Sequence, residues 1–251
     1  MTDIPVALQL YSVREEMAKD FKGTLRRVAD MGYEGVEFAG LFDNDPEEVG
    51  DLCEQLGLGI AGAHVQINQI QEFELQATMA TMIALGNDFI VVPWLPEEYR
   101  DSVEAWKRTA NVFSASVEKV TQQDLELGYH NHKEEFMPLE GEIPWDVFME
   151  NTRLEVFGQL DVGHCLRAGQ DPLLYLQKYP GRYLTVHVKD FDPDNENALV
   201  GEGIADWEAI FAACEDVAGT EWYIIEQEEY PVPPMESVRK CLENVNEMLG
   251  R

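Results

Sequence analysis

The chain has 251 residues, 45% of them hydrophobic, which suits one globular domain with a sizeable core. It carries 18 basic against 48 acidic residues, and this net charge of −30 argues against nucleic-acid binding, because affinity for a phosphate backbone comes largely from cationic contacts. No apolar run reaches the roughly 18 residues that a membrane span needs, so we expect no membrane partner.

Two further features bear on the compartment. The N-terminal segment, residues 1–5, lacks a basic stretch followed by an apolar one, which argues against a secretory signal. The acidic residues are spread along the whole chain, as in a solvated acidic surface compatible with a salt-rich cytoplasm. We therefore expect a cytoplasmic protein with reduced thiols, since its cysteines form no C-x-x-C pair: Cys53, Cys165, Cys214 and Cys241.

Short apolar runs alternate with amphipathic stretches, a rhythm typical of repeated strand–helix units around a parallel sheet. Asp45 and Pro46 mark the start of one helix, and Gly32 and Gly86 follow the ends of two others. The expected strands are residues 6–10, 35–38, 58–64, 89–92, 125–130, 158–161, 183–189 and 221–226. The expected helices are residues 19–31, 46–56, 75–85, 102–120, 206–217 and 235–249, with two more beginning at 144 and 172.

Eight strand–helix pairs is the number in a TIM barrel. A doubly wound sheet usually has fewer strands and often a glycine-rich phosphate turn, and no such motif follows any expected strand here. The sequence therefore predicts an α/β fold, a (β/α)8 TIM barrel in which residues 1–251 form a single domain.

The histidines of the chain all fall at one face of this barrel. Reactive groups of such barrels lie at the C-terminal ends of the strands and on the loops that follow. Random placement would put some of the five on helices, so the set predicts a functional site. Its members are His64, His130, His132, His164 and His187.

Two carboxylates join them in otherwise apolar strands. Asp161 ends the sixth expected strand and Glu226 ends the eighth. A lone ionised carboxylate is costly to bury without a cation, a hydrogen-bond network or a metal. The sequence offers no obvious basic ion-pair partner for Asp161 or for Glu226. We expect Asp161, His187 and Glu226 to hold one divalent ion, with Mn²⁺, Co²⁺ or Zn²⁺ suiting this ligand set better than Mg²⁺.

These segments resemble the xylose isomerase-like TIM-barrel superfamily over nearly the whole chain. The motifs are residues 160–164 (LDVGH), residues 187–190 (HVKD), residues 201–203 (GEG) with Asp206-Trp207, and Glu226. The resemblance implies one divalent metal held by Glu, Asp, His and Glu from strands five to eight, of which Asp161, His187 and Glu226 match the last three. The first ligand departs from the pattern, because His130 stands where the glutamate is usual.

The resemblance leaves two candidates for that first ligand. His130 itself could ligate, or Glu135 could reach back from the loop, and we favour Glu135 slightly because a carboxylate preserves the charge of the shell. The resemblance also implies a small-molecule sugar substrate and a metal-stabilised enediolate formed by deprotonation beside a carbonyl. Glu226 is the expected base, with Glu135 opposite it and Lys189 stabilising negative charge.

The remaining imidazoles are expected to contact substrate hydroxyls or relay protons: His64, His130, His132 and His164. The leading hypothesis is a metal-dependent sugar isomerase or epimerase. The alternatives are a dehydratase or lyase acting on keto-sugars or keto-glycosides, of the inosose dehydratase type, and a non-catalytic sugar-binding barrel. The sugar, the metal and assembly into a homo-oligomer remain open from the sequence.

Overall fold

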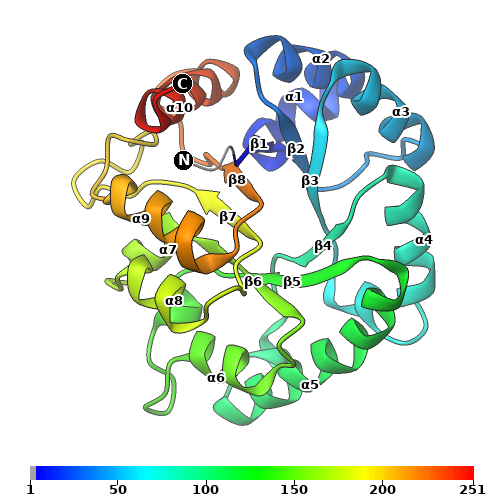
Figure 1. Ribbon diagram of the computed structural model, residues 1–251, viewed down its shortest axis with the longest axis vertical. Coiled ribbons are helices and arrows are strands. Elements are labelled where there is room, and N and C mark those ends of the chain that lie inside the picture. Colours follow the sequence, from blue (N-terminus) through cyan, green and yellow to red (C-terminus); the bar gives the residue numbers. More distant parts are fainter. Residues whose placement is uncertain (1–3) are drawn as a thin grey trace.

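The computed structural model describes residues 4–251 and forms a closed barrel of eight parallel strands, in which each strand pairs with the next and β8 pairs with β1 (Figure 1). The (β/α)8 barrel predicted from the sequence is confirmed. The strands are β1 (Val6–Gln9), β2 (Gly35–Phe38), β3 (Gly59–His64), β4 (Phe89–Val92), β5 (Glu126–His130), β6 (Val156–Asp161), β7 (Thr185–Val188) and β8 (Trp222–Ile225).

Helices surround the strands on the outside of the ring (Figure 1). Asp45, expected at the start of a helix, is its N-cap, because its side chain accepts from the backbone N–H groups of Glu47 and Glu48. Asp171 caps α8 in the same way by accepting from the Leu173 N–H. The helices are α1 (Arg14–Lys19), α2 (Phe21–Met31), α3 (Pro46–Leu56), α4 (Leu75–Leu85), α5 (Val103–Val120), α6 (Pro144–Asn151), α7 (Val162–Arg167), α8 (Pro172–Lys178), α9 (Trp207–Ala213) and α10 (Pro234–Leu249). Short 3-10 turns and one π turn fill several connections: η1 (Leu10–Val13), η2 (Ile67–Ile70), η3 (Glu97–Tyr99), η4 (Thr121–Gln123), η5 (Glu134–Phe136) and η6 (Cys214–Ala218).

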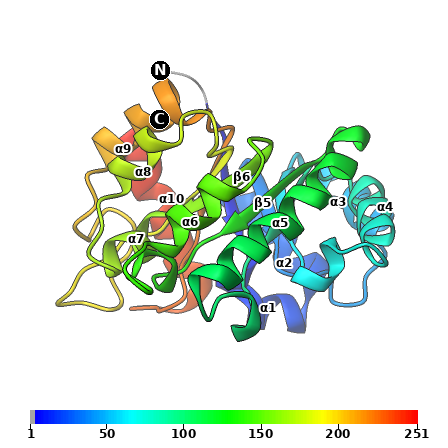
Figure 2. The ribbon, with the colours of Figure 1, turned by 90° about the horizontal axis from the view of Figure 1, so that it is seen from below.

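Two local differences from the expected elements matter for the site. The helix expected over residues 19–31 begins at Phe21 as α2, because Asp20 leaves helical geometry and caps α2 by accepting from the Gly23 N–H, and a separate helix, α1, precedes it. At the end of β6 the chain enters α7 at once, with Asp161 as its N-cap. In the side view of Figure 2, α1 and α7 lie toward one end of the barrel and the C-terminus toward the other.

The interior of the barrel has two layers of different chemistry. Side chains alternate between inside and outside along each strand. At the end where the strands begin, the interior is apolar and is filled around Trp222, which has room because Gly35 and Gly59 lack a side chain: a Cβ at either would meet its ring at 2.6 or 2.7 Å. The next inward-facing residues, toward the C-terminal ends of the strands, are polar: Gln9, Glu37, His64, His130, Gln159 and His187. The apolar layer therefore supports a buried polar floor at the C-terminal ends of the strands.

The four cysteines are free and buried, in agreement with the expectation of unpaired thiols. Within residues 4–251, no helix combines the length and apolar character that crossing a membrane would require.

Candidate active site

Four buried side chains from neighbouring strands converge at the C-terminal end of the barrel. His130 and Asp161 end β5 and β6, His187 lies in β7, and Glu226 directly follows β8. Each offers one nitrogen or oxygen, and these four atoms lie within 4.8 Å of one another. The structure thus brings together the three residues expected to hold a metal and adds His130 as the fourth.

Burial and mutual contacts decide the protonation of this group. Burial raises the pKa of Asp161 to about 7, although Lys189 opposes the rise. Burial would lower the pKa of His187, but the carboxylates of Glu37 and Glu226 outweigh it and raise that pKa to about 10. Burial would raise the pKa of Glu226, but Lys189 together with His187 holds that pKa well below its ordinary value.

The donor set fits a divalent cation. One carboxylate oxygen of Asp161 accepts from the His164 N–H at 2.6 Å, while the other, Oδ2, is buried and has no hydrogen-bond partner in the described part of the chain. That oxygen lies 3.9 Å from His187 Nδ1, which in turn lies 3.2 Å from Glu226 Oε2. Two carboxylates balance a charge of +2, and two imidazoles beside them suit Zn²⁺, Co²⁺ or Mn²⁺ better than Mg²⁺.

Glu37 of β2 is a fifth buried residue at this site, and the sequence analysis did not single it out. Its Oε2 lies 2.7 Å from His187 Nε2 and 3.2 Å from His64 Nε2. Burial would raise the pKa of Glu37, but these two imidazoles hold it well below the ordinary value. The available signal was the one that identified Asp161, namely a carboxylate within an otherwise apolar strand.

Gln159 of β6 links Glu37 to the imidazole of β5. Its amide nitrogen donates to Glu37 Oε1 at 2.7 Å, and its amide oxygen lies 3.1 Å from His130 Nδ1. Because an amide oxygen only accepts, His130 carries its proton on Nδ1 and leaves Nε2 without one. Burial lowers the pKa of His130 well below its ordinary value, so the ring is neutral.

Glu135 lies elsewhere than the sequence analysis favoured. It belongs to the turn η5, where its buried carboxylate accepts from the Tyr129 hydroxyl at 2.8 Å and from the His132 N–H at 2.7 Å. It is not part of the converging group, in which His130 occupies the corresponding position. Of the two candidates, His130 is the one that the structure brings into the converging group.

Lys189 lies just beyond β7 among acceptors. It forms a close ion pair with Glu228, which the sequence analysis did not consider, and its Nζ lies 3.7 Å from Glu226 Oε2 and 3.3 Å from His164 Nε2. Burial would lower the pKa of Lys189, but the neighbouring carboxylates, Glu226 foremost, raise it above its ordinary value. Burial, with Lys189 adding to it, lowers the pKa of His164 to about 2, so that imidazole is neutral beside a fixed ammonium.

A cavity of about 280 Å³ opens directly above these groups. Trp94 and Tyr11 are about half exposed and line it. Four of the five histidines also line it, and His187 lies below, completely buried. The lining consists of Tyr11, Ala39, His64, Gln66, Pro93, Trp94, His130, His132, His164, Glu226 and Glu228, and thus contains carboxylates and imidazoles but neither Lys nor Arg.

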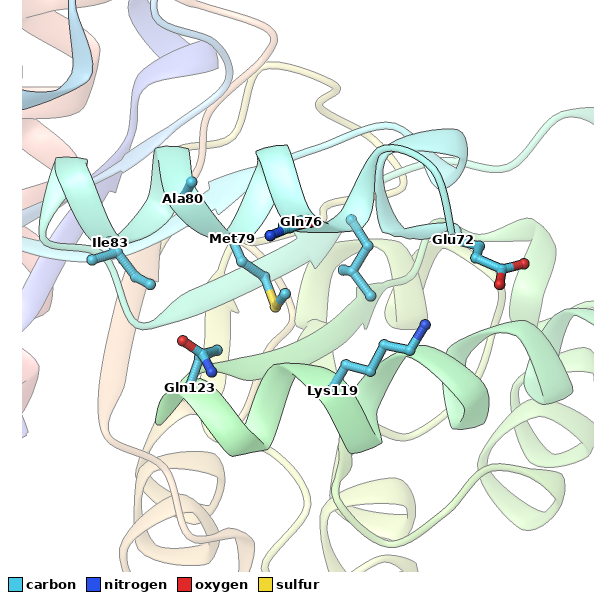
Figure 3. Close-up of a pocket in the computed structure, with 8 residues that line it drawn as sticks. Glu72, Gln76, Met79, Ala80, Ile83, Lys119 and Gln123 are labelled. Atoms are coloured by element: carbon cyan, nitrogen blue, oxygen red, sulfur yellow. The ribbon is translucent and has the colours of Figure 1, made fainter.

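A second hollow lies outside the barrel, between α4 and the end of α5 (Figure 3). This groove measures about 400 Å³, and Met79 and Ile83 of α4 face Lys119 and Gln123 across it (Figure 3). It has one acidic and one basic side chain, Glu72 and Lys119, and no imidazole. This groove therefore lacks the cluster of imidazoles and carboxylates that lines the cavity above the barrel.

Comparisons with known proteins agree with this architecture. A family model described as xylose isomerase-like TIM barrel matches residues 25–248. An inosose dehydratase of Clostridium botulinum (strain Alaska E43 / Type E3) is 24% identical over 248 residues, covering 84% of this chain and 83% of the relative.

Solved structures at low sequence identity share the fold. A sugar phosphate isomerase/epimerase from Parabacteroides distasonis superposes with a TM-score of 0.85 at 23% identity, covering 98% of this chain and 94% of that one. The IOLI protein, described with a bound zinc atom, superposes with a TM-score of 0.75 at 14% identity, covering 98% of both chains. At these identities the likeness is one of fold alone.

Proposed function

This chain belongs to the xylose isomerase-like TIM-barrel family, and we propose that it is a divalent-metal-dependent sugar isomerase or epimerase. The observation that carries the proposal is the convergence of His130, Asp161, His187 and Glu226 beneath an imidazole-lined cavity. The proposed reaction removes a proton from the carbon next to a substrate carbonyl. The proton then returns to the opposite face of the same carbon in an epimerisation, or to the former carbonyl carbon in an isomerisation.

The four converging residues would hold the metal, with His130 taking the place for which the sequence favoured Glu135. A bound divalent ion supplies Lewis-acid polarisation of the carbonyl, which acidifies the neighbouring C–H bond. Glu226 belongs both to this group and to the cavity lining, so its carboxylate is the base within reach of a substrate. Glu135 instead supports the loop through Tyr129 and His132.

Other side chains of the cavity bind and orient the substrate. His64, His132 and His164 present imidazoles along the wall, where they hydrogen-bond hydroxyl groups or pass a proton between two positions. Lys189 sits behind Glu226 and His164 and stabilises negative charge that develops on the substrate oxygen. Trp94 and Tyr11 supply flat apolar surface against a sugar ring.

The substrate we propose is a small, unphosphorylated keto-sugar or related polyol. Among residues 4–251, no cationic side chain lines the cavity, whereas phosphate recognition ordinarily uses Arg, Lys or backbone N–H groups. The volume of the cavity, about 280 Å³, is at the small end of the range for ligand pockets and suits a ligand with a single ring.

The test is proton exchange in D₂O. Metal-loaded protein is incubated with a panel of unphosphorylated ketoses, and NMR follows deuterium at the carbon beside the carbonyl. We expect exchange together with a new epimer or aldose, and a loss of at least about 10²-fold in Glu226→Gln, because general-base catalysis contributes that much. Glu229→Gln, an exposed neighbour, is the control and should retain full exchange. Metal-loaded wild-type protein that binds sugars without exchanging protons would instead indicate a non-catalytic sugar-binding barrel.

A second candidate is a dehydratase acting on a keto-sugar or keto-cyclitol. It is supported by the inosose dehydratase relatives and by the pair formed by Lys189 and His164, which places a proton source beside Glu226. The same first step would then be followed by loss of a hydroxyl as water. Product analysis separates the two candidates, because elimination lowers the substrate mass by one water whereas isomerisation leaves it unchanged.

A further inference from the structure

We infer that Glu37 is a positioning residue that sets the proton positions of both imidazoles in the proposed metal site, and the inference rests on that proposed site. Glu37 lies on β2, across the barrel from β6, and it does not belong to the converging group of four. It reaches His187 directly and His130 through Gln159.

The direct contact determines which nitrogen of His187 is available. Glu37 Oε2 lies 2.7 Å from His187 Nε2, and an ionised carboxylate only accepts hydrogen bonds. The Nε2 therefore carries a proton, and Nδ1, on the opposite side of the ring toward Asp161 and Glu226, is the nitrogen left for a cation. A carboxylate behind a ligating histidine also fixes the ring orientation and raises its basicity as a ligand.

The indirect contact does the same for His130. Glu37 Oε1 accepts from the Gln159 amide nitrogen at 2.7 Å, which turns the Gln159 amide oxygen toward His130 Nδ1 at 3.1 Å. His130 then donates from Nδ1 and leaves Nε2 free. One carboxylate thus orients two rings on different strands and leaves, in each ring, the other nitrogen outside the supporting hydrogen bond.

The fold makes a dedicated place for this carboxylate. The pairing of β2 with β3 shifts register between Val36 and Glu37, so that Glu37 pairs with Gly62, and a Cβ on Gly62 would lie 2.7 Å from Glu37 Oε1. Bulges of this kind re-aim side chains near functional sites. Gln9 of β1 donates a further hydrogen bond to Glu37 Oε2 at 2.7 Å, and His64 Nε2 of β3 lies 3.2 Å from the same oxygen, so the carboxylate is held from both neighbouring strands.

The first experiment measures metal affinity without reference to turnover. Zinc and cobalt titrations by calorimetry compare wild type, Glu37→Gln and Glu126→Gln, the last being a partly buried glutamate at the opposite end of the barrel. We expect Glu37→Gln to bind about 10- to 100-fold more weakly, as for other residues behind metal ligands, and Glu126→Gln to bind as wild type does. The d–d absorption of cobalt-loaded Glu37→Gln should shift as well, because the ligand geometry changes. Unchanged affinity and absorption in a folded Glu37→Gln protein would overturn the inference.

A second measurement needs no variant and covers the case in which Glu37→Gln fails to fold. Long-range ¹H–¹⁵N NMR of the imidazoles in zinc-loaded wild type should show His187 protonated at Nε2 and His130 protonated at Nδ1. The opposite proton positions in either ring would overturn the inference while leaving the metal site intact. Wild-type protein that binds no divalent metal would overturn the metal site and the inference together, so the two failures are distinguishable.

Discussion

At the scale of single residues, two of the four proposed metal ligands, His187 and Asp161, carry protons near neutral pH. The pKa of His187 is raised to about 10 and that of Asp161 to about 7, so at neutral pH the imidazole is doubly protonated and the carboxyl is about half protonated. Both groups offer a lone pair only after losing a proton. Metal binding at this site should therefore release protons and depend on pH.

The sign and size of this dependence follow from the two values. Between about pH 7 and pH 10 only the His187 proton is displaced, and the apparent affinity should rise about tenfold per pH unit; below pH 7 the Asp161 proton adds to it, and the slope approaches about 100-fold per unit. Zinc titration in buffers of different ionisation enthalpy should detect release of between one and two protons per ion at pH 7. Asp171→Asn, on an exposed N-cap, is the control and should show the same release. An affinity independent of pH from 6 to 8 would contradict the assignment.

The buried carboxylates of the site could be predicted from the sequence by one rule, although it was applied to two strands and not to the third. A carboxylate in an apolar strand identified Asp161 and Glu226, and the same rule applied to residues 35–38 would have identified Glu37. The choice between His130 and Glu135 depends on the direction of a side chain in the turn η5, where Tyr129 and the His132 backbone hold Glu135. Strand patterns contain no information about that direction.

At the scale of elements, one carboxylate organises the long connection between β7 and α9. Asp190 accepts from the backbone N–H groups of Phe191, Gly201 and Ala205 at 2.9, 2.9 and 3.2 Å, and from the Trp207 indole N–H at 2.9 Å. A Cβ on Gly203 would lie 2.1 Å from Asp190 Oδ1, so this position admits no side chain without displacing the carboxylate. The loop is thereby tied to the strand end that carries His187 and Lys189.

Removing this carboxylate should loosen the loop and destabilise the protein. In Asp190→Ala several donors lose a charged acceptor in a largely buried setting, so we expect the free energy of unfolding to fall by about 3 kcal/mol or more. Urea denaturation measures the loss, and limited proteolysis should cut residues 191–206 faster. Asp194→Ala, an exposed change in the same loop, should shift stability by no more than about 0.5 kcal/mol. Equal stability of the two variants would show that the loop is held by other contacts.

Element positions were largely predictable because each strand is a short apolar run bounded by turn residues. All eight strands lie within the expected ranges or overlap them, although β6 begins at Val156, before the expected residue 158. The helices α1 and α7 were missed, since each has six residues and spans fewer than two turns, too few for a periodic pattern. The break at Asp20 depends on a single capping side chain, which periodicity does not reveal.

At the scale of the whole molecule, charge repulsion should dominate the long-range electrostatics. With 48 acidic and 18 basic residues, most carboxylates have no cationic partner to pair with. Exposed ion pairs such as that of Lys22 with Glu48 contribute little each, and salt weakens them. Salt weakens the more numerous repulsions at the same time, so its net effect should be stabilising.

The thermal midpoint should therefore rise with ionic strength, and the range over which it rises tests the salt-rich-habitat hypothesis. The Debye length falls from about 30 Å at 0.01 M to about 3 Å at 1 M salt. If salt acts by screening alone, most of the rise in the thermal midpoint should therefore occur below about 0.2 M. A protein adapted to a salt-rich cytoplasm should continue to gain well above 1 M NaCl and lose structure in dilute buffer. Circular dichroism melts from 0.01 to 3 M NaCl distinguish these cases, with equal-osmolality sucrose as the uncharged control. Full folding in dilute buffer with a plateau below 0.2 M would reject the habitat hypothesis, whereas a midpoint independent of salt would mean that the carboxylates repel one another less than their number implies.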